Sequence, residues 1–531
     1  MMIENHIFKT DSEKLTAKLF NDFELKCIDL DFVIKTSSNL DLGEVDGIFV
    51  DDSNEIVFIY DDSELQSPNA KIVSFFQKWS NKDNLSELIK LKNLPDDYRY
   101  YVIYIDKTRT SEERVKLEPI KNSIPSDCIV VFKDDFDYFQ QLSKEIKKWA
   151  KNDFYNFLQL RPKNKTSIKR KVIKYFIGDT PAYVFSDKAE KILQYSYVYR
   201  RSDKSKIGYQ RALNKEKIRA MRKFINSGEL DSFPNSILLN CVEQITEIID
   251  PSNGNANKAD CPKEIEIDIP NYFCSCRVVD GQHRLLSLCN VDDMIISKFS
   301  LPIVLFNNMD IKKEIKTFIE INDNQTSIDK NLTISLKAQL DWPSGSKENL
   351  EKIAYLICEK IISSNKGFSS RIYKGYANES TVLNNNKKIT IQQFIQSIIK
   401  NKIVQKNVGI IQSDINDIET PAKIINETYT KLINANGSNA NFYYSNRGMD
   451  LILRFIGIIN INIKLGYFSY TYEDALNDFI SHINKVLPTI TNYYGAGAVA
   501  KSFDELFIEF KKSSKKYDNI ENDLRKLNFK K

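Results

Sequence analysis

Short apolar runs alternate with polar spacers over residues 1–150, and the spacers carry apolar residues at helical intervals. This alternation is typical of a mixed or parallel sheet flanked by helices, and it predicts an N-terminal α/β module. The runs with the length and composition of strands are 32–36, 45–50, 55–60, 100–105 and 128–132.

The pattern changes twice further along the chain. Residues 176–345 mix strand-like runs with helical periodicity, and residues 346–531 are predominantly helical. Residues 151–175, between the N-terminal module and residue 176, form a basic stretch that is predicted to be a linker. Strands are predicted over 182–185, 195–199, 236–239, 264–269, 273–279 and 301–306, and helices over 215–226, 311–321, 347–362, 391–399, 422–433, 449–463, 472–487 and 503–511.

Three predictions concern the connections in the middle of the chain. Pro270 and Asn271 separate two strand-like runs, 264–269 and 273–279, so these runs are predicted to pair as a hairpin. Residues 251–260 are rich in Asn, Gly, Ser and Pro and are predicted to be a loop. Residues 322–325 are predicted to be the polar exit of the preceding helix.

Composition narrows the class of protein. With 531 residues, the chain exceeds what one hydrophobic core supports, so two or three domains are expected. No run of 18 apolar residues occurs and the first residues lack an apolar signal-peptide centre, which predicts a cytoplasmic protein without a membrane segment. The eight cysteines are scattered; Cys274 and Cys276 are expected to be buried thiols, with a zinc site that adds Cys261 and His283 as the weaker alternative.

The modest net charge of +5 is unevenly distributed. Residues 161–174 contain seven Lys or Arg and no acid, and residues 200–223 contain ten against Asp203 and Glu216. Basic stripes of this kind suit the phosphate backbone of double-stranded DNA. The alternative is a solvated linker and a lysine-rich helix face, which explains the first stretch alone about equally well. The residues predicted to contact DNA are Lys169, Arg170, Lys171, Arg200 and Arg201.

Residues 280–284, Asp-Gly-Gln-His-Arg, follow a strand-like run directly and precede the apolar start of a helix. Gly281 lets the backbone approach an anion, and Arg284 carries a planar fork that fits two phosphate oxygens. The helix start would face the same anion. The stretch therefore predicts a phosphate site, in which His283 donates to phosphate or moves a proton and Asp280 holds Mg²⁺ or only forms the turn.

The same five residues carry a resemblance to a known family. Together with Gly208-Tyr209-Gln210-Arg211, residues 233–237 and residues 318–325, they resemble the DGQHR-domain proteins, which include DndB-type proteins of DNA phosphorothioation systems. The resemblance covers residues 200–340 and implies a central α+β domain of the ParB and sulfiredoxin superfamily. Gln282 stands where sulfiredoxins have their redox cysteine, so sulfinic acid reduction is not implied.

The resemblance implies a nucleotide site. ATP is the expected ligand, or another NTP, with Mg²⁺ as a candidate companion. The residues expected to bind it are Gly281, Gln282, His283, Arg284, Gln210, Arg211, Asn322, Asn324 and Gln325, with Asp280 and His283 as catalytic candidates. A surface pair at Gln210 and Arg211, and helix-capping amides at 322–325, are the alternatives.

The N-terminal module has a resemblance of its own. The runs 43–50 and 55–60 are similar to the core hairpin of restriction-endonuclease-like folds, where an acid on one strand and an acid-x-Lys on the next bind a metal. Here the second strand continues as Asp61-Asp62-Ser63, without the lysine. A degenerate copy used for binding, or an unrelated α/β fold, is therefore favoured over an active nuclease.

The combined expectation is a DNA-associated nucleotide-binding protein, an ATPase that regulates or assists bacterial DNA modification of the phosphorothioation type or phage defence. Its partners would be double-stranded DNA and modification or restriction proteins; self-association is left open. The alternatives are a DNA-binding transcriptional repressor without enzymatic activity and a defence nuclease that acts through residues 1–150.

Overall fold

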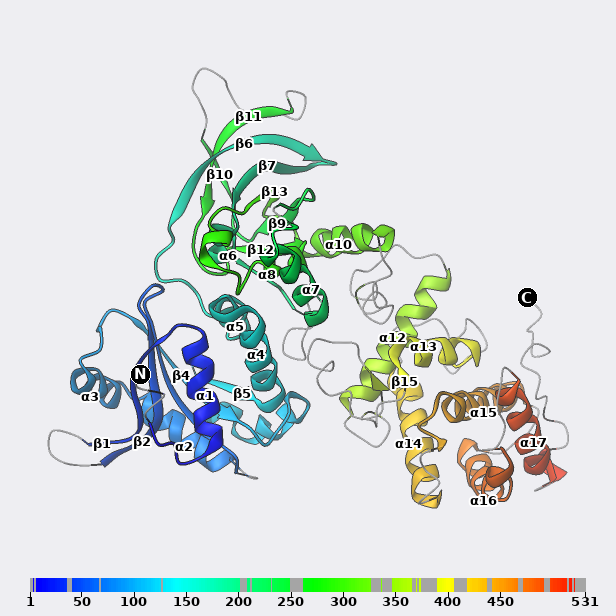
Figure 1. The fold of residues 1–531 in the computed structure, drawn as a ribbon. Helices are drawn as coiled ribbons and strands as arrows, with labels where there is room; N and C mark the ends of the chain where they lie inside the picture. The colour runs from blue at the N-terminus through cyan, green and yellow to red at the C-terminus, as the bar shows by residue number, and fades with distance from the viewer. Residues whose placement is uncertain are drawn as a thin grey trace. The chain divides into compact units, whose positions relative to one another are not determined.

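The computed structural model divides into two compact units, residues 1–318 and residues 319–531 (Figure 1). The structure describes residues 3, 6–35, 41–65, 68–125, 128–200, 208–210, 213–230, 232–248, 261–325, 336, 346–364, 369, 372–373, 389–404, 418–436, 442–466, 471–490, 497–512, 515–517 and 520. The predicted loop 251–260 lies outside these residues.

A five-stranded mixed sheet forms the core of the N-terminal part, in the order β1-β2-β3-β4-β5. The first three strands are antiparallel, and β4 and β5 run parallel to β3. The prediction of a mixed sheet is thus confirmed, since all five predicted runs fall in or overlap its strands. The strands are β1 (Lys26–Lys35), β2 (Asp41–Asp51), β3 (Ile56–Ser63), β4 (Arg99–Asp106) and β5 (Cys128–Phe132).

Helices cover both faces of this sheet (Figure 1), so β3 is buried along its whole length. On one face, Phe20 of α1 packs against the rings of Phe58 and Tyr60. On the other, Phe76 and Trp79 of α2 join the aliphatic core. The helices of this part are α1 (Asp11–Asp22), α2 (Asn69–Trp79), α3 (Lys82–Lys92), η1 (Ser111–Ser123), α4 (Lys133–Ile146), η2 (Lys147–Trp149) and α5 (Ala150–Phe157).

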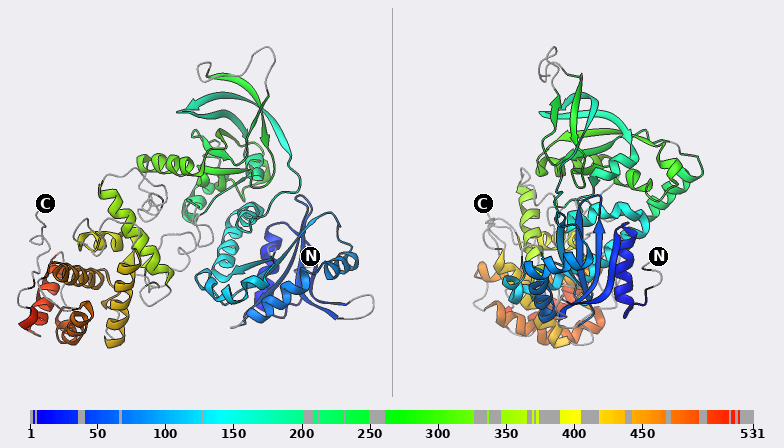
Figure 2. Two further views of the ribbon diagram at one scale, coloured as in Figure 1. Left: turned by 180° about the vertical axis from the view of Figure 1, so that it is seen from behind. Right: turned by 90° about the vertical axis from the view of Figure 1, so that its left-hand side faces the viewer.

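A second sheet of eight strands follows in the same unit, in the order β10-β11-β6-β7-β13-β9-β12-β8. Figures 1 and 2 show this part of the chain from three directions. Its strands are β6 (Ser167–Ile177), β7 (Thr180–Lys188), β8 (Ser196–Tyr197), β9 (Ile237–Cys241), β10 (Thr246–Ile248), β11 (Lys263–Pro270), β12 (Cys276–Asp280) and β13 (Ser300–Asn307). Its helices are α6 (Ala189–Tyr195), α7 (Lys215–Asn226), α8 (Gln282–Ser287), α9 (Asp293–Ile296) and α10 (Ile311–Gln325), the last of which continues into the second unit.

The predicted hairpin of 264–269 with 273–279 is wrong. β11 pairs with β6 and β10, whereas β12 pairs with β8 and β9. Residues 273–275 form a turn in which Cys274 has a φ of 60°, so the chain leaves the extended conformation before β12 begins. For the same reason Cys274 and Cys276 do not share a strand.

Regular structure also occupies most of the predicted linker 151–175. Helix α5 packs against the second sheet: Asn152 Nδ2 donates to the carbonyl oxygens of Leu193 and Ser196 at 2.9 and 3.1 Å. Tyr155 lies edge-on to the ring of Phe273. The helix therefore ties the first sheet to the second.

The second unit is helical, as predicted, with a two-stranded sheet of β14 (Ile372–Tyr373) and β15 (Ile389–Thr390). One apolar core joins its helices, centred on residues such as Phe455 and Phe479, whose rings stack. Among the described residues, no helix has the length and apolar character that a membrane crossing needs. The helices are α12 (Ser346–Ser363), α13 (Ile391–Lys400), α14 (Glu419–Asn436), α15 (Asn446–Lys464), α16 (Tyr472–Ile490), α17 (Ala498–Lys512) and η7 (Lys515–Tyr517).

Candidate functional site

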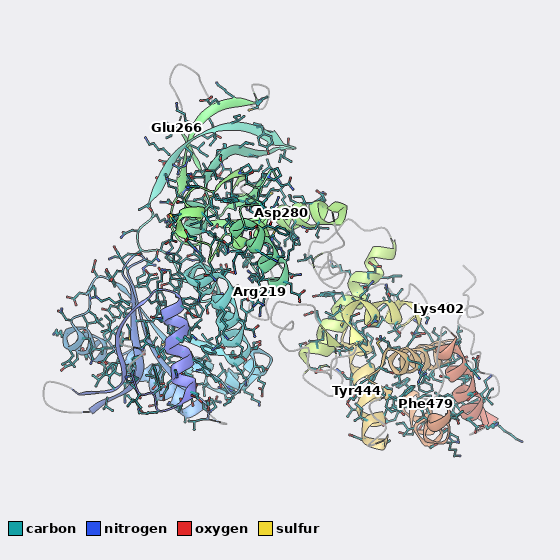
Figure 3. All side chains as sticks on the ribbon, in the orientation of Figure 1. Arg219, Glu266, Asp280, Lys402, Tyr444 and Phe479 are labelled. Carbon is teal, nitrogen blue, oxygen red and sulfur yellow. The ribbon has the colours of Figure 1, made fainter. Side chains whose placement is uncertain are left out.

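The turn 280–284 joins the end of β12 to α8, with Asp280 at its start (Figure 3). Gly281 has a φ of +90°, and a Cβ at this position would lie 2.7 Å from Cδ1 of Ile237. The turn therefore requires glycine for both its conformation and its space. Arg284 Nη2 donates to Asp280 Oδ2 at 2.8 Å, and the two side chains are 17% and 22% exposed.

The two residues between them point inward. Gln282 and His283 are only 6% and 8% exposed. Gln282 Nε2 donates to Gln210 Oε1 at 2.9 Å, and Gln210 Nε2 in turn donates to the carbonyl oxygens of Val278 and Val279. The structure thus brings Gln210 and Gln282 together, as the sequence predicted for one pocket, but the two amides hold the end of β12.

His283 Nε2 accepts a hydrogen bond from the backbone N–H of Asn214 at 3.2 Å. A ring nitrogen that accepts this bond carries no proton. His283 therefore cannot donate to phosphate through Nε2 in this conformation, and it also fixes the start of α7.

Arg200 extends this buried network toward α5. Its Nη1 donates to Gln282 Oε1 at 3.4 Å, and its Nε donates to Asp153 Oδ2 at 3.1 Å. Asp153 Oδ1 accepts from the backbone N–H of Val198. With 8% of its surface exposed, Arg200 cannot contact DNA phosphates in this conformation, contrary to the sequence prediction.

A second buried centre, which the sequence reasoning missed, surrounds Glu314 of α10. Glu314 is fully buried and accepts hydrogen bonds from Tyr209 Oη, Asn240 Nδ2 and the guanidinium of Arg277. The feature of the sequence that could have revealed this centre is an acid on the apolar face of a helix, next to Ile315 and Phe318. A buried acid of this kind requires partners, which Tyr209 and Arg277 provide.

The remaining predicted nucleotide contacts divide into two groups. Asn322, Asn324 and Gln325 lie within the last turns of α10 rather than in a polar exit, because the helix continues to Gln325. Arg211, like the DNA candidate Arg201, lies outside the described residues.

The basic stretch on β6 faces acids. Lys169 and Lys171 are exposed, but the register of β6 with β11 places them opposite Asp268 and Glu266. Directly opposed residues of antiparallel strands are neighbours on one face, so their charges offset each other. Arg170 is paired with Asp187 at 2.8 Å. The local field for DNA is weaker than the sequence of β6 alone predicts.

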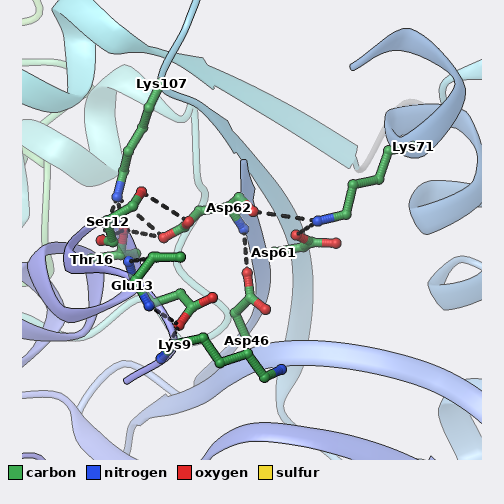
Figure 4. A network of polar contacts seen from close by, with 10 residues as sticks. Lys9, Ser12, Glu13, Thr16, Asp46, Asp61, Asp62, Lys71 and Lys107 are labelled. Carbon is green, nitrogen blue, oxygen red and sulfur yellow. Dashed lines mark hydrogen bonds and ion pairs between the residues drawn. The ribbon is translucent and has the colours of Figure 1, made fainter. Parts of the chain in front are cut away.

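Acids gather on the N-terminal sheet, where Asp46 of β2 lies near Asp61 and Asp62 of β3 (Figure 4). The register of β2 with β3 places Asp46 beside Asp61, and Asp46 Oδ2 accepts from the backbone N–H of Asp62 at 2.7 Å. Burial and the neighbouring carboxylate of Asp61 raise the pKa of Asp46 to about 8. Lys71 of α2 donates to Asp61 Oδ1 at 2.7 Å, and Lys107 pairs with Asp62.

A search with protein-family models matches residues 170–430 to DndB, described as DNA-sulfur modification-associated. The chain thus contains a DndB-like region. No curated protein and no solved structure matches it. The family associates the chain with DNA sulfur modification.

The DndB-like region contains the turn 280–284, Gln210 and the buried centre around Glu314. The N-terminal sheet and its acids lie outside the match, so nothing about them follows from the family.

Proposed function

We propose that this DndB-like protein is a DNA-associated nucleotide-binding regulator of a DNA sulfur-modification system, with Arg284 as its main phosphate contact and ATP as the preferred nucleotide. The observation that supports this role is a difference in burial within the turn 280–284. Gln282 and His283 are buried and hold the fold, whereas Asp280 and Arg284 remain partly exposed as an ion pair.

An ion pair of this kind can exchange partners. The guanidinium of Arg284 would bind phosphate oxygens in place of the Asp280 carboxylate, because bidentate contacts to phosphate are among the stronger charge-assisted hydrogen bonds. The released carboxylate of Asp280 would be an oxygen ligand for Mg²⁺, the ion that accompanies nucleotide phosphates.

The buried network offers a route from this site to the rest of the unit. Gln282 contacts Arg200, and Arg200 contacts Asp153 of α5, the helix that ties the two sheets together. A change in the conformation of the turn on nucleotide binding would therefore alter the contacts of α5. Regulation of this kind needs a different affinity of the nucleotide for the two arrangements.

The test is nucleotide binding by calorimetry together with phosphate release from ATP and CTP, with and without double-stranded DNA. Arg284→Ala should abolish both, and Arg284→Lys should restore binding in part, because an ammonium lacks the planar fork. Arg222→Ala is the matched control, since this partly buried guanidinium of α7 contacts the carbonyl oxygen of Glu145 instead.

Absence of nucleotide binding by the parent protein would contradict the proposal. Binding without phosphate release, together with DNA gel shifts that ATP leaves unchanged, would favour the alternative of a repressor without turnover.

DNA binding has its own test on β6. Lys169→Ala with Lys171→Ala should weaken DNA binding and flatten its salt dependence, because fewer counterions are released. Glu266→Gln with Asp268→Asn should strengthen binding, because the acids opposite these lysines are removed. If neither pair of substitutions changes the affinity, β6 is not the DNA surface.

A metal-dependent nuclease in the N-terminal part is the second candidate, and Lys71 is the observation that favours it. The lysine missing from β3 is replaced in space by Lys71 of α2, whose Nζ lies 2.7 Å from Asp61 and next to the Asp46–Asp61 pair. Cleavage of DNA that requires Mg²⁺, is lost in Asp46→Ala and Lys71→Ala and persists in Lys82→Ala would support it. Intact DNA under these conditions would rule it out.

A further inference from the structure

Three acids form a row across the first three strands of the N-terminal sheet. Gly47 of β2 pairs with Leu30 of β1 and with Tyr60 of β3. The next residues along these strands, Asp31, Asp46 and Asp61, therefore lie side by side. Like charges opposite one another destabilise a sheet, so a cation or a bound proton stabilises a row of this kind.

A fourth acid approaches the row from α1. Glu13, Asp31 and Asp46 each place a carboxylate oxygen within 4.8 Å of the other two. Backbone amides orient two of these groups: Lys9 N–H and Thr10 N–H donate to Glu13 Oε2, and Asp62 N–H donates to Asp46 Oδ2. The positions of these carboxylates are thus fixed by the capping box of α1 and by β3 before any ligand binds.

An independent observation comes from Tyr60. Its side chain is fully buried, and its hydroxyl has no hydrogen-bond partner among the described residues. The ring lies over Gly47, beside Asp46, and the hydroxyl is close enough to Asp46, Asp62 and Glu13 for their charges to act on it. A buried hydroxyl without a partner is costly, and a water held at the acids would satisfy it.

The local charge balance is negative. Asp31 is paired with Lys9, whose side chain is 53% exposed and also contacts Glu44, so the ammonium occupies the outer side of the cluster without being enclosed by it. The carboxylates of the cluster outnumber its lysines. The acids are Glu13, Asp31, Glu44, Asp46, Asp61 and Asp62, and the lysines are Lys9, Lys71 and Lys107.

We propose that Glu13, Asp31 and Asp46 form a binding site for one divalent cation of the Mg²⁺ or Mn²⁺ type, with Tyr60 donating to a water on that cation. Hard cations of this kind take oxygen ligands from carboxylates and keep several waters. The site is independent of the nucleotide proposal, and the nuclease candidate would use it.

The experiment is titration of the full, chelator-treated chain with Mn²⁺, without DNA or nucleotide, followed by calorimetry and by the electron paramagnetic resonance signal of free Mn²⁺. Asp46→Asn and Glu13→Gln should each weaken binding by roughly 10-fold or more. Asp187→Asn should leave it unchanged, because this buried acid pairs with Arg170 in the other sheet. Lys9→Gln should strengthen binding, since it removes the competing ammonium.

Circular dichroism and thermal melting of each variant keep the result interpretable. Should Asp46→Asn fail to fold, Lys9→Gln and Tyr60→Phe still decide the question, because they change affinity in opposite directions. Absence of Mn²⁺ binding by the parent chain, or equal weakening in Asp187→Asn, would overturn the proposal. Mn²⁺ binding without DNA cleavage would leave the cation site standing and contradict the nuclease alone.

Discussion

The polar groups around the turn 280–284 and the acids of the N-terminal sheet are both buried in the first unit, but their partners differ. Around the turn, most amides, carbonyls and opposite charges satisfy one another, as in Gln282 with Gln210 and Arg277 with Glu314. In the N-terminal sheet, Asp46 lies between two other acids and Tyr60 lacks a partner among the described residues.

This difference indicates that the network around the turn stabilises the fold, whereas the acids of the N-terminal sheet can bind a ligand. A polar network whose members satisfy one another contributes to specificity of the fold and leaves little capacity for binding. A cluster with excess charge and an unsatisfied donor gains stability when a cation arrives. The sequence motif 280–284 thus lies in a region where most polar groups are already hydrogen-bonded to one another.

Glu314→Ala provides the strongest test of the satisfied network. The substitution would leave the guanidinium of Arg277 buried without its carboxylate, and breaking a buried pair in this way costs about 3–5 kcal/mol of unfolding free energy. Urea denaturation followed by tryptophan fluorescence measures it. A loss below about 1 kcal/mol would mean that the network tolerates an unpaired charge and is not a rigid framework.

Gly281→Ala should have the next largest effect. A left-handed conformation costs an ordinary residue about 1–2 kcal/mol, and the new Cβ would also press against Ile237. Gly178→Ala is the matched control, because Gly178 is also left-handed, with a φ of +62°, but no atom lies within 4 Å of the place that its Cβ would take. Equal losses of stability in the two variants would show that the turn does not need the space.

Asp46→Asn should increase the stability of the metal-free protein, whereas the two preceding substitutions decrease it. Because the pKa of Asp46 is raised to about 8, the folded state holds a proton that the unfolded state has released between about pH 4 and pH 8. Stability of the metal-free protein therefore falls as pH rises through this window, by at most about 1.4 kcal/mol per pH unit from this group.

The asparagine variant removes that dependence. Thermal unfolding in the presence of a chelator should show the variant gaining stability over the parent as pH rises from 6 to 8, values inside the window set by the raised pKa. Parallel curves for the two proteins would indicate that the pKa of Asp46 is not raised in the folded protein.

Much of the fold followed from local patterns in the sequence. The helix Lys215–Asn226 was predicted with its observed bounds, because its apolar spacing is a local feature. Strand positions in the first sheet were predicted for the same reason. The partner of β11 was not, since the alternation of 264–269 fits several neighbours and only the turn at Cys274 excludes β12.

The candidate sites show the same limit. The sequence indicated that Gln210 and Gln282 belong together, but whether they face a ligand or the core depends on burial by distant segments. The sequence also lacked a lysine at the expected place on β3, and Lys71 approaches Asp61 only because α2 folds back over the sheet. Contacts of this kind depend on tertiary structure and leave no local pattern.

Arg284→Ala should have the smallest effect on stability, and that makes it the most informative substitution for function. The Asp280–Arg284 pair is partly exposed and spans four residues at a helix start, where such pairs contribute about 0.3–0.5 kcal/mol. Urea denaturation should therefore hardly distinguish the variant from its parent, whereas nucleotide binding should be lost. Arg277→Ala is the contrasting control, because this buried arginine should cost stability. A large loss of stability in Arg284→Ala would show that Arg284 stabilises the fold. The turn would then resemble the rest of the buried network rather than a binding site.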